Sequence, residues 1–297
     1  MKKSVFTFFI SLLLFSCEKD KQIIIENTDI PLISRVLIGG EIYMEYTYND
    51  ANLVTEEKSK FRYAMHTYND INQLIISDFY WDISIASSDS RVIEAAMNRK
   101  EWVSPENTPK SISHKFEYNS KEQLFRKSFI RPLENNNDFR EFQYENDRIV
   151  RITGYYNNSI SGYTIYQYDE YGNVIRQTKY MVSSSGIPEL RTTTEYEYDN
   201  MHNPYQSFNR LITPGIYTNP NNIKKETYTL NFDVAPSIEK VQVTEYTYKY
   251  NANGYPVKVN SEKEYAWDGY DIPWPINPPI LSDKDRSAIG SMKEMSR

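Results

Sequence analysis

The side chains that could perform chemistry are few and lie far apart along the chain. The 297 residues contain three histidines, His66, His114 and His202, and one cysteine, Cys17. The histidines lack the spacing of a zinc motif, and none stands in a nucleophile–base motif. The sequence has neither a Gly-x-Ser-x-Gly elbow nor a glycine-rich phosphate loop. We therefore predict no catalytic residue, no metal ligand and no cofactor. The sequence does not identify a ligand.

Carboxylates are abundant, with 40 Asp and Glu residues against 34 Lys and Arg. A pair that works as acid and base is defined by its separation in space, which the sequence does not give. The acidic turn at residues 169–173 lacks the alternating acids and terminal glutamate of a calcium loop. A net charge of −6 without a basic run argues against nucleic acid as a partner.

The aromatic residues follow a pattern that occurs seven times: a ring, a polar residue, a tyrosine, a polar turn, and then an apolar residue or proline. The clearest copies are residues 166–174 and 248–256. The two rings are one residue apart, so they project from the same face of a strand, and the residue between them is polar in every unit. The pattern predicts an antiparallel sheet of hairpins with one aromatic face and one solvated face.

The turns fix the predicted register of these hairpins. Asp169 suits the start of a type I turn, and Gly172 suits the left-handed position of a three-residue loop followed by a bulge. Glu122 fits that left-handed position poorly, whereas His202 is predicted to occupy it as a turn residue. The turn after Tyr144 is one residue shorter. The predicted cross-strand pairs are Tyr48–Val54, Tyr68–Leu74, Tyr118–Leu124, Tyr144–Ile149, Tyr166–Arg176, Tyr168–Val174, Tyr198–Pro204 and Tyr250–Pro256.

Rings could also bind sugars, because flat amphipathic side chains stack on sugar faces. Alternation assigns the repeat tyrosines to the core. Trp81, Trp267 and Trp274 lie outside the repeat and are better candidates for a binding surface.

Two further segments stand apart from the repeat: residues 88–100 suit a short helix, and the proline-rich residues 272–279 suit the end of the sheet.

The N-terminus has the layout of a signal peptide. Lys2 and Lys3 precede an apolar stretch at residues 5–15, which is too short to span a membrane. The tetrad Leu14-Phe15-Ser16-Cys17 resembles a bacterial lipoprotein lipobox. The resemblance implies cleavage before Cys17 and acylation of its thiol, so that acyl chains on Cys17 hold the protein to a membrane. The charged residues 18–21 resemble the surface-export tethers of Bacteroidetes lipoproteins.

The repeat itself resembles the tyrosine–aspartate (YD) repeats of Rhs-type proteins, most clearly at residues 166–174. Together with the lipobox, the chain is similar to Bacteroidetes lipoproteins that carry a repeat domain of unknown function, described as porin-like in fold. The resemblance covers roughly residues 40–260 and transfers no functional residue to this chain.

The predicted fold is therefore all-β, an antiparallel meander of repeated β-hairpins that forms a curled sheet or a barrel-like domain. The predicted parts are a signal peptide at 1–16, a lipidated tether at 17–34, a repeat domain at 35–270 and a polar tail at 271–297.

The predicted function is a non-catalytic binding or scaffold protein, anchored by lipid in the outer membrane or at the cell surface, with a glycan or a surface protein as partner. One alternative is a glycan-binding protein or an enzyme acting on glycans or the cell wall, which would need two carboxylates of perturbed pKa in one cleft. A transmembrane barrel is a third hypothesis, and it would need an apolar band facing lipid.

Overall fold

The computed structural model describes residues 31–81, 101–132, 137–212, 214–232, 240–260 and 263–267. The chain divides into a unit of residues 1–30 and a unit of residues 31–297. The predicted signal peptide, Cys17, most of the tether, the helix at 88–100, Trp274 and the proline-rich run all lie outside the described residues. Within the described residues, no helix combines the length and apolarity needed to cross a membrane.

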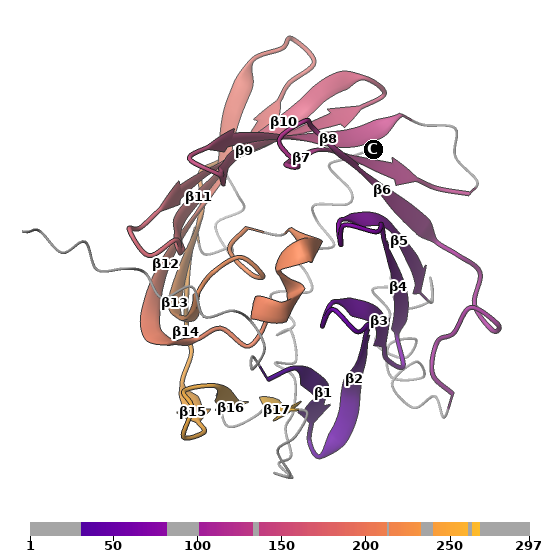
Figure 1. Ribbon diagram of the computed structural model, residues 1–297. Helices are drawn as coiled ribbons and strands as arrows, with labels where there is room; N and C mark the ends of the chain where they lie inside the picture. Colours follow the sequence, from indigo (N-terminus) through magenta and orange to yellow (C-terminus); the bar gives the residue numbers. More distant parts are fainter. Residues whose placement is uncertain are drawn as a thin grey trace, which may run out of the picture. The chain divides into compact units, whose positions relative to one another are not determined.

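The described residues of the second unit form one sheet of 17 antiparallel strands and one short 3-10 helix (Figure 1). The strands are β1 (Ile33–Ile38), β2 (Glu41–Tyr48), β3 (Val54–Lys58), β4 (Arg62–Tyr68), β5 (Leu74–Trp81), β6 (Ile112–Tyr118), β7 (Leu124–Ile130), β8 (Asp138–Glu145), β9 (Arg148–Tyr156), β10 (Ser159–Tyr168), β11 (Val174–Val182), β12 (Pro188–His202), β13 (Asn221–Leu230), β14 (Val241–Glu245), β15 (Tyr248–Tyr250), β16 (Pro256–Val259) and β17 (Lys263–Trp267), and the helix is η2 (Gln206–Leu211).

Each strand from β1 to β14 pairs with the next one along the chain, so the all-β meander is confirmed. Strands β15, β16 and β17 pair in the same way, and β17 pairs with β1. The first and last strands of the meander are therefore neighbours. Among the described strands, β14 and β15 are not paired with each other. They follow one another directly in the chain, and β14 pairs with β13 while β15 pairs with β16.

The predicted hairpin register is confirmed at six of the seven repeat tyrosines. The confirmed pairs are Tyr48–Val54, Tyr68–Leu74, Tyr118–Leu124, Tyr144–Ile149, Tyr168–Val174 and Tyr250–Pro256. Tyr198 pairs with Ile223 and not with Pro204, because β12 continues to His202 and the chain then leaves the sheet before β13. Tyr166 pairs with Gln177 and not with Arg176, because the bulge beside Tyr168 shifts the register by one residue.

The turn positions differ from the prediction at two residues. Gly172 has a φ of 99°, as expected for the left-handed position. Glu122 also takes this position, with a φ of 61°, so the expectation of a poor fit was wrong. The turn is held by Asn119, whose side-chain oxygen accepts from the backbone N–H groups of Lys121 and Gln123 at 2.9 and 3.0 Å. His202 lies in β12 and is not left-handed.

A hydrogen bond that the repeat pattern does not predict joins successive units. The second tyrosine of a unit donates its hydroxyl to the backbone carbonyl of the apolar residue that closes the preceding unit. We call these residues the tyrosine ladder: Tyr68 to Val54 at 2.8 Å, Tyr118 to Leu74 at 2.9 Å, Tyr168 to Ile149 at 2.7 Å and Tyr198 to Val174 at 2.6 Å; Tyr144 forms a hydrogen bond with the backbone of Leu124 at the equivalent place. Each ring therefore lies on the aromatic face while its hydroxyl satisfies a backbone carbonyl at the start of the preceding strand.

The core lies on this aromatic face. Its central cluster consists of Leu74, Phe116, Leu124, Phe142, Ile149, Tyr166 and Val174, against which Leu211 and Ile212 pack. The last two residues belong to the segment at 203–220 that connects β12 to β13, here called the inserted segment. Phe208 of this segment is only 1% exposed, and its ring lies 4.8 Å from that of Tyr46. The inserted segment, drawn in orange in Figure 1, thus covers part of the tyrosine face.

Candidate functional site

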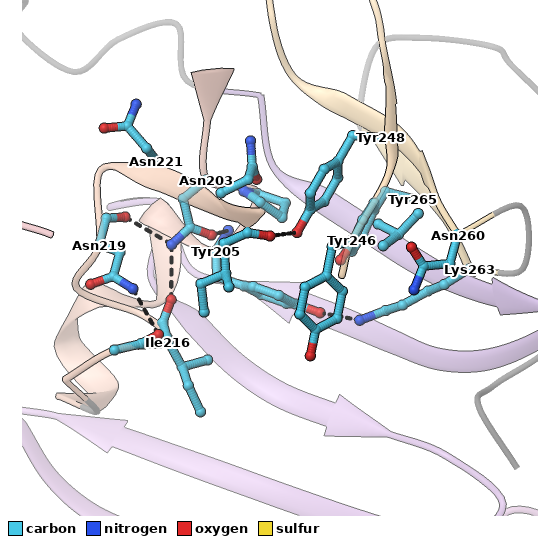
Figure 2. A pocket seen from close by; sticks show the side chains of 15 residues that line it. Asn203, Tyr205, Ile216, Asn219, Asn221, Tyr246, Tyr248, Asn260, Lys263 and Tyr265 are labelled. Carbon is cyan, nitrogen blue, oxygen red and sulfur yellow. Dashed lines mark hydrogen bonds between the residues drawn. The ribbon is translucent and has the colours of Figure 1, made fainter. Parts of the chain in front are cut away.

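A pocket of about 280 Å³ lies between the inserted segment and strands β13 to β17 (Figure 2). Its polar lining contains asparagine amides, tyrosine hydroxyls and one lysine, and none of the described lining residues is aspartate or glutamate. The lining residues are Asn203, Pro204, Tyr205, Gly215, Ile216, Asn219, Asn221, Asn222, Ile223, Tyr246, Tyr248, Val259, Asn260, Lys263 and Tyr265. Such a mixture of apolar rings with a few convergent polar groups is typical of a small-molecule site.

Lys263 is the charged group of the pocket. Its ammonium donates to the hydroxyl of Tyr205 at 2.7 Å, and its Nζ lies 5.3 and 5.0 Å from the ring centres of Tyr205 and Tyr265. Burial alone would lower the pKa of Lys263, but the neighbouring tyrosines, Tyr205 first, outweigh that effect and raise the pKa above its usual value. Lys263 is therefore a fully charged ammonium in a largely aromatic wall.

The asparagines of the pocket hold its wall in place. Asn203 donates to the carbonyls of Ile216 and Asn219, both at 2.8 Å (Figure 2). Asn219, only 1% exposed, donates to Gly215 at 2.7 Å and accepts from the backbone N–H of Val174 at 3.0 Å. These bonds fasten the inserted segment to itself and to β11. The pocket is thus built before any ligand arrives.

The structure brings one histidine into a polar cluster with a serine and an acid. On the paired strands β3, β4 and β5, His66 Nδ1 lies 2.8 Å from Ser77 Oγ, and His66 Nε2 lies 3.1 Å from Glu57 Oε1. Arg62 forms a further ion pair with Glu57. Burial favours the neutral acid, but the hydrogen bond from His66 and the charge of Arg62 lower the pKa of Glu57.

This cluster has the residue types of a nucleophile–base–acid relay but no room for a substrate. Ser77 is 1% exposed, and His66 and Glu57 are each 4% exposed. We interpret the three side chains as mutually satisfied polar groups in the core. The bulge beside Tyr68 places Ser77 opposite His66, whereas the predicted register would have placed Ile76 there, so the sequence did not point to this contact.

The other two histidines lie elsewhere. The ring of His114 packs 4.6 Å from that of Phe79 and 4.9 Å from that of Phe129, and burial lowers the pKa of His114 to about 3, so this histidine is neutral. His202 stacks on Tyr255 at 4.7 Å. In the described part of the chain, no group of three His, Cys, Asp or Glu side chains is arranged to hold a metal ion.

A second hollow, of about 410 Å³, lies among the hairpin turns. Arg148 on its wall donates to the carbonyls of Asp169 and Glu170 at 2.9 and 3.4 Å, so its guanidinium is already engaged in holding the next turn.

Of the three tryptophans predicted to form a binding surface, the structure describes the side chain of Trp81 alone, which is 39% exposed at the end of β5. A tryptophan surface therefore stays a prediction.

The sequence pattern did not point to the 280 Å³ pocket. Of its four tyrosines only Tyr248 belongs to a repeat unit, and the repeat assigned that ring to the core. Residues 203–222 do carry an unusual signal, since five of these 20 residues are asparagine. Asparagine favours turns and side-chain bonds to the backbone. That density could have indicated a structured insertion, but not a pocket.

No protein-family model and no curated protein sequence matches the chain. Among solved structures, a porin-like protein from Bacteroides vulgatus ATCC 8482 is 10% identical, with a TM-score of 0.37, over 81% of this chain and 100% of the other. A porin-like protein from Bacteroides uniformis ATCC 8492 is also 10% identical, with a TM-score of 0.37, over 80% of this chain and 96% of the other.

The crystal structure of TcdB2-TccC3 is 12% identical, with a TM-score of 0.29, over 76% of this chain; the chain spans 10% of that much longer protein. At these identities and TM-scores the similarities assign no activity, ligand or location to this chain.

Proposed function

We propose that the protein is a non-catalytic binding protein, anchored by lipid at the outer membrane or cell surface, that holds a small glycan unit in the pocket beside Lys263. The observation that carries the proposal is the pocket itself. It combines the rings of Tyr205, Tyr246 and Tyr248 with amide and hydroxyl groups on a wall already fixed by internal hydrogen bonds. Sugars need this combination of flat apolar faces and directed polar contacts.

The composition of the pocket favours binding over hydrolysis. Glycoside hydrolysis generally needs two carboxyl groups on opposite sides of the scissile bond. The pocket lining includes neither aspartate nor glutamate. The buried Glu57 of the His66 cluster is not among the lining residues and is closed to substrate.

The membrane anchor rests on the sequence. The basic residues, the short apolar stretch and the tetrad ending at Cys17 support export and acylation. The outer membrane or the cell surface is where an acylated chain with surface-export residues at 18–21 would meet glycans.

The proposal is tested by calorimetric titration of the purified, lipidated protein in detergent with a panel of hexoses, amino sugars and their disaccharides. Binding by at least one member is expected. Tyr246→Ala should abolish that binding without changing the unfolding temperature by more than a few degrees. Tyr171→Ala is the matched control, because Tyr171 is 72% exposed and lies outside the pocket. Failure of the whole panel to bind, or equal binding by Tyr246→Ala, would reject the proposal.

A further inference from the structure

In the described part of the chain, no ion pair joins the ammonium of Lys263 to a carboxylate, whereas several other lysines do form one. Lys58, Lys60, Lys110, Lys115 and Lys225 each lie 2.7 to 3.3 Å from an acidic oxygen. The hydrogen-bond partner that the described structure gives the Lys263 ammonium is the neutral hydroxyl of Tyr205, at 2.7 Å. The hydroxyl of Tyr205 and the rings of Tyr205 and Tyr265 stabilise this positive charge without neutralising it, so an anionic ligand could supply the counter-ion.

Asp199, whose charge acts on the pocket residue Tyr248, is already engaged in other hydrogen bonds. Asp199 accepts from the hydroxyl of Tyr250, and its oxygens also accept from the backbone N–H groups of Met201 and Asn222, at 2.9 and 3.2 Å. The carboxylate of Asp199 therefore stabilises the end of β12 through these hydrogen bonds. The charge of Lys263 is left facing the pocket that it lines.

The chemistry of the wall specifies the kind of anion. An ammonium has three donor hydrogens, and one of them is directed to Tyr205, which leaves two for a ligand. The pocket contains no arginine, and phosphate groups are typically held by arginine forks or clusters of backbone N–H groups. One unpaired positive charge balances one negative charge. A carboxylate fits this site better than a doubly charged phosphate.

We infer that the pocket selects a saccharide bearing one carboxylate, as hexuronic acids do, and that Lys263 pairs with that carboxylate while the tyrosine rings contact the sugar. This inference rests on the proposed glycan-binding function and adds the ligand class. The partners on the protein side are Nζ of Lys263 for the carboxylate and the rings of Tyr246 and Tyr248 for the sugar ring.

The test compares sugars that differ only in the oxidation of C6: glucuronate with glucose, galacturonate with galactose, and mannuronate with mannose. Calorimetric titration of the purified full chain should show tighter binding of at least one acid than of its parent sugar. A charge-assisted hydrogen bond makes the difference about tenfold or more in Kd. Lys263→Gln should erase the preference, so that the acid and its parent sugar bind with similar Kd, whereas Lys263→Arg should keep the preference.

The outcomes separate the two proposals. Equal binding of acid and parent sugar by the wild-type protein overturns the inference and leaves the proposed function standing. No binding by any of the six sugars counts against both. The wild-type comparison needs no variant, so it decides the matter even if a substitution prevents folding.

Unfolding of the ligand-free protein gives a second readout. In the ligand-free protein the described hydrogen bond of the Lys263 ammonium is the one to Tyr205, so Lys263→Met should lower the unfolding temperature by no more than about 4 °C. A larger fall would show that Lys263 chiefly stabilises the fold and would overturn the inference.

Discussion

The tyrosine ladder makes a prediction that separates the hydroxyl from the ring. In Tyr168→Phe the ring stays and only the donor is lost, so the carbonyl of Ile149, now 2.7 Å from the hydroxyl, loses its partner on β10. The contact lies at the boundary of the core cluster, where Tyr168 packs against Ile149 and Val174. Water cannot replace the bond at no cost, because the neighbouring Val174 is fully buried.

The expected magnitude follows from that loss. Leaving a buried acceptor unpaired costs about 1 to 3 kcal/mol. In a domain of this size each kcal/mol lowers the unfolding temperature by about 2 to 4 °C, so a fall of roughly 2 to 12 °C is expected. Tyr168→Ala should cost more, about 3 to 5 kcal/mol, because the ring contacts are lost as well.

The assay is denaturant unfolding followed by circular dichroism, with Tyr171→Phe as control. Tyr171 lies in the turn that follows Tyr168 and is 72% exposed, so removal of its hydroxyl should change the free energy of unfolding by less than about 0.5 kcal/mol. Equal effects of the two Tyr→Phe changes would show that the ladder bonds contribute nothing to stability.

Three other predictions concern the anchor, the turns and the response to pH. Cys17→Ser should leave the protein without acyl chains and release it from the membrane fraction; mass spectrometry that found an unmodified Cys17 in the mature wild-type protein would contradict this. Gly172→Val should destabilise by about 1 to 3 kcal/mol, since a β-branched residue is strained at a φ of 99°, and a thermal shift no larger than that of the exposed Glu170→Ala would reject the turn assignment. Burial raises the pKa of Tyr118 and of Tyr166 to about 12, so stability that is present below about pH 10 should be lost as the pH rises through about 12, because only the unfolded tyrosines ionise in that window. Titration of phenolate absorbance in parallel with circular dichroism checks this, and tyrosines that ionise with an ordinary pKa in a fully folded protein would contradict it.

The repeat predicted the architecture because its signal is local. A ring, a polar residue and a tyrosine before a four-residue turn determine both the face and the register of a hairpin, and the six confirmed pairs follow from turn geometry alone. The polar residue of the unit, such as Gln167, is exposed where its neighbour Tyr166 is buried. Alternation thus predicted which face carries the core, although the second tyrosine of each unit is only partly buried and, in four units, packs against the core cluster.

The features that were missed depend on contacts between units. The register of Tyr198 failed because nothing local marks β12 as a strand that continues past the usual turn into the inserted segment. The left-handed Glu122 is held by Asn119, three residues earlier, and residue preference alone does not reveal that. The pocket beside Lys263 needs residues from β13 to β17 and from residues 203–219 at once. Sequence patterns of short period carry no information on such assembly.

The pairing of β1 with β17 has a consequence for the order of folding. A hairpin brings together residues that are about six positions apart, whereas Ile33 and Trp267 must meet across nearly the whole described chain. Loop-closure entropy grows with the logarithm of length, so this last pairing costs about 3 kcal/mol more than closing a hairpin. The hairpins should therefore form first and the β1–β17 contact last.

Until that contact forms, the nascent sheet exposes two unpaired edges that can add a strand from another molecule. The interval between formation of the first hairpin and the pairing of β1 with β17 is therefore when the chain is most exposed to edge-to-edge association with other copies.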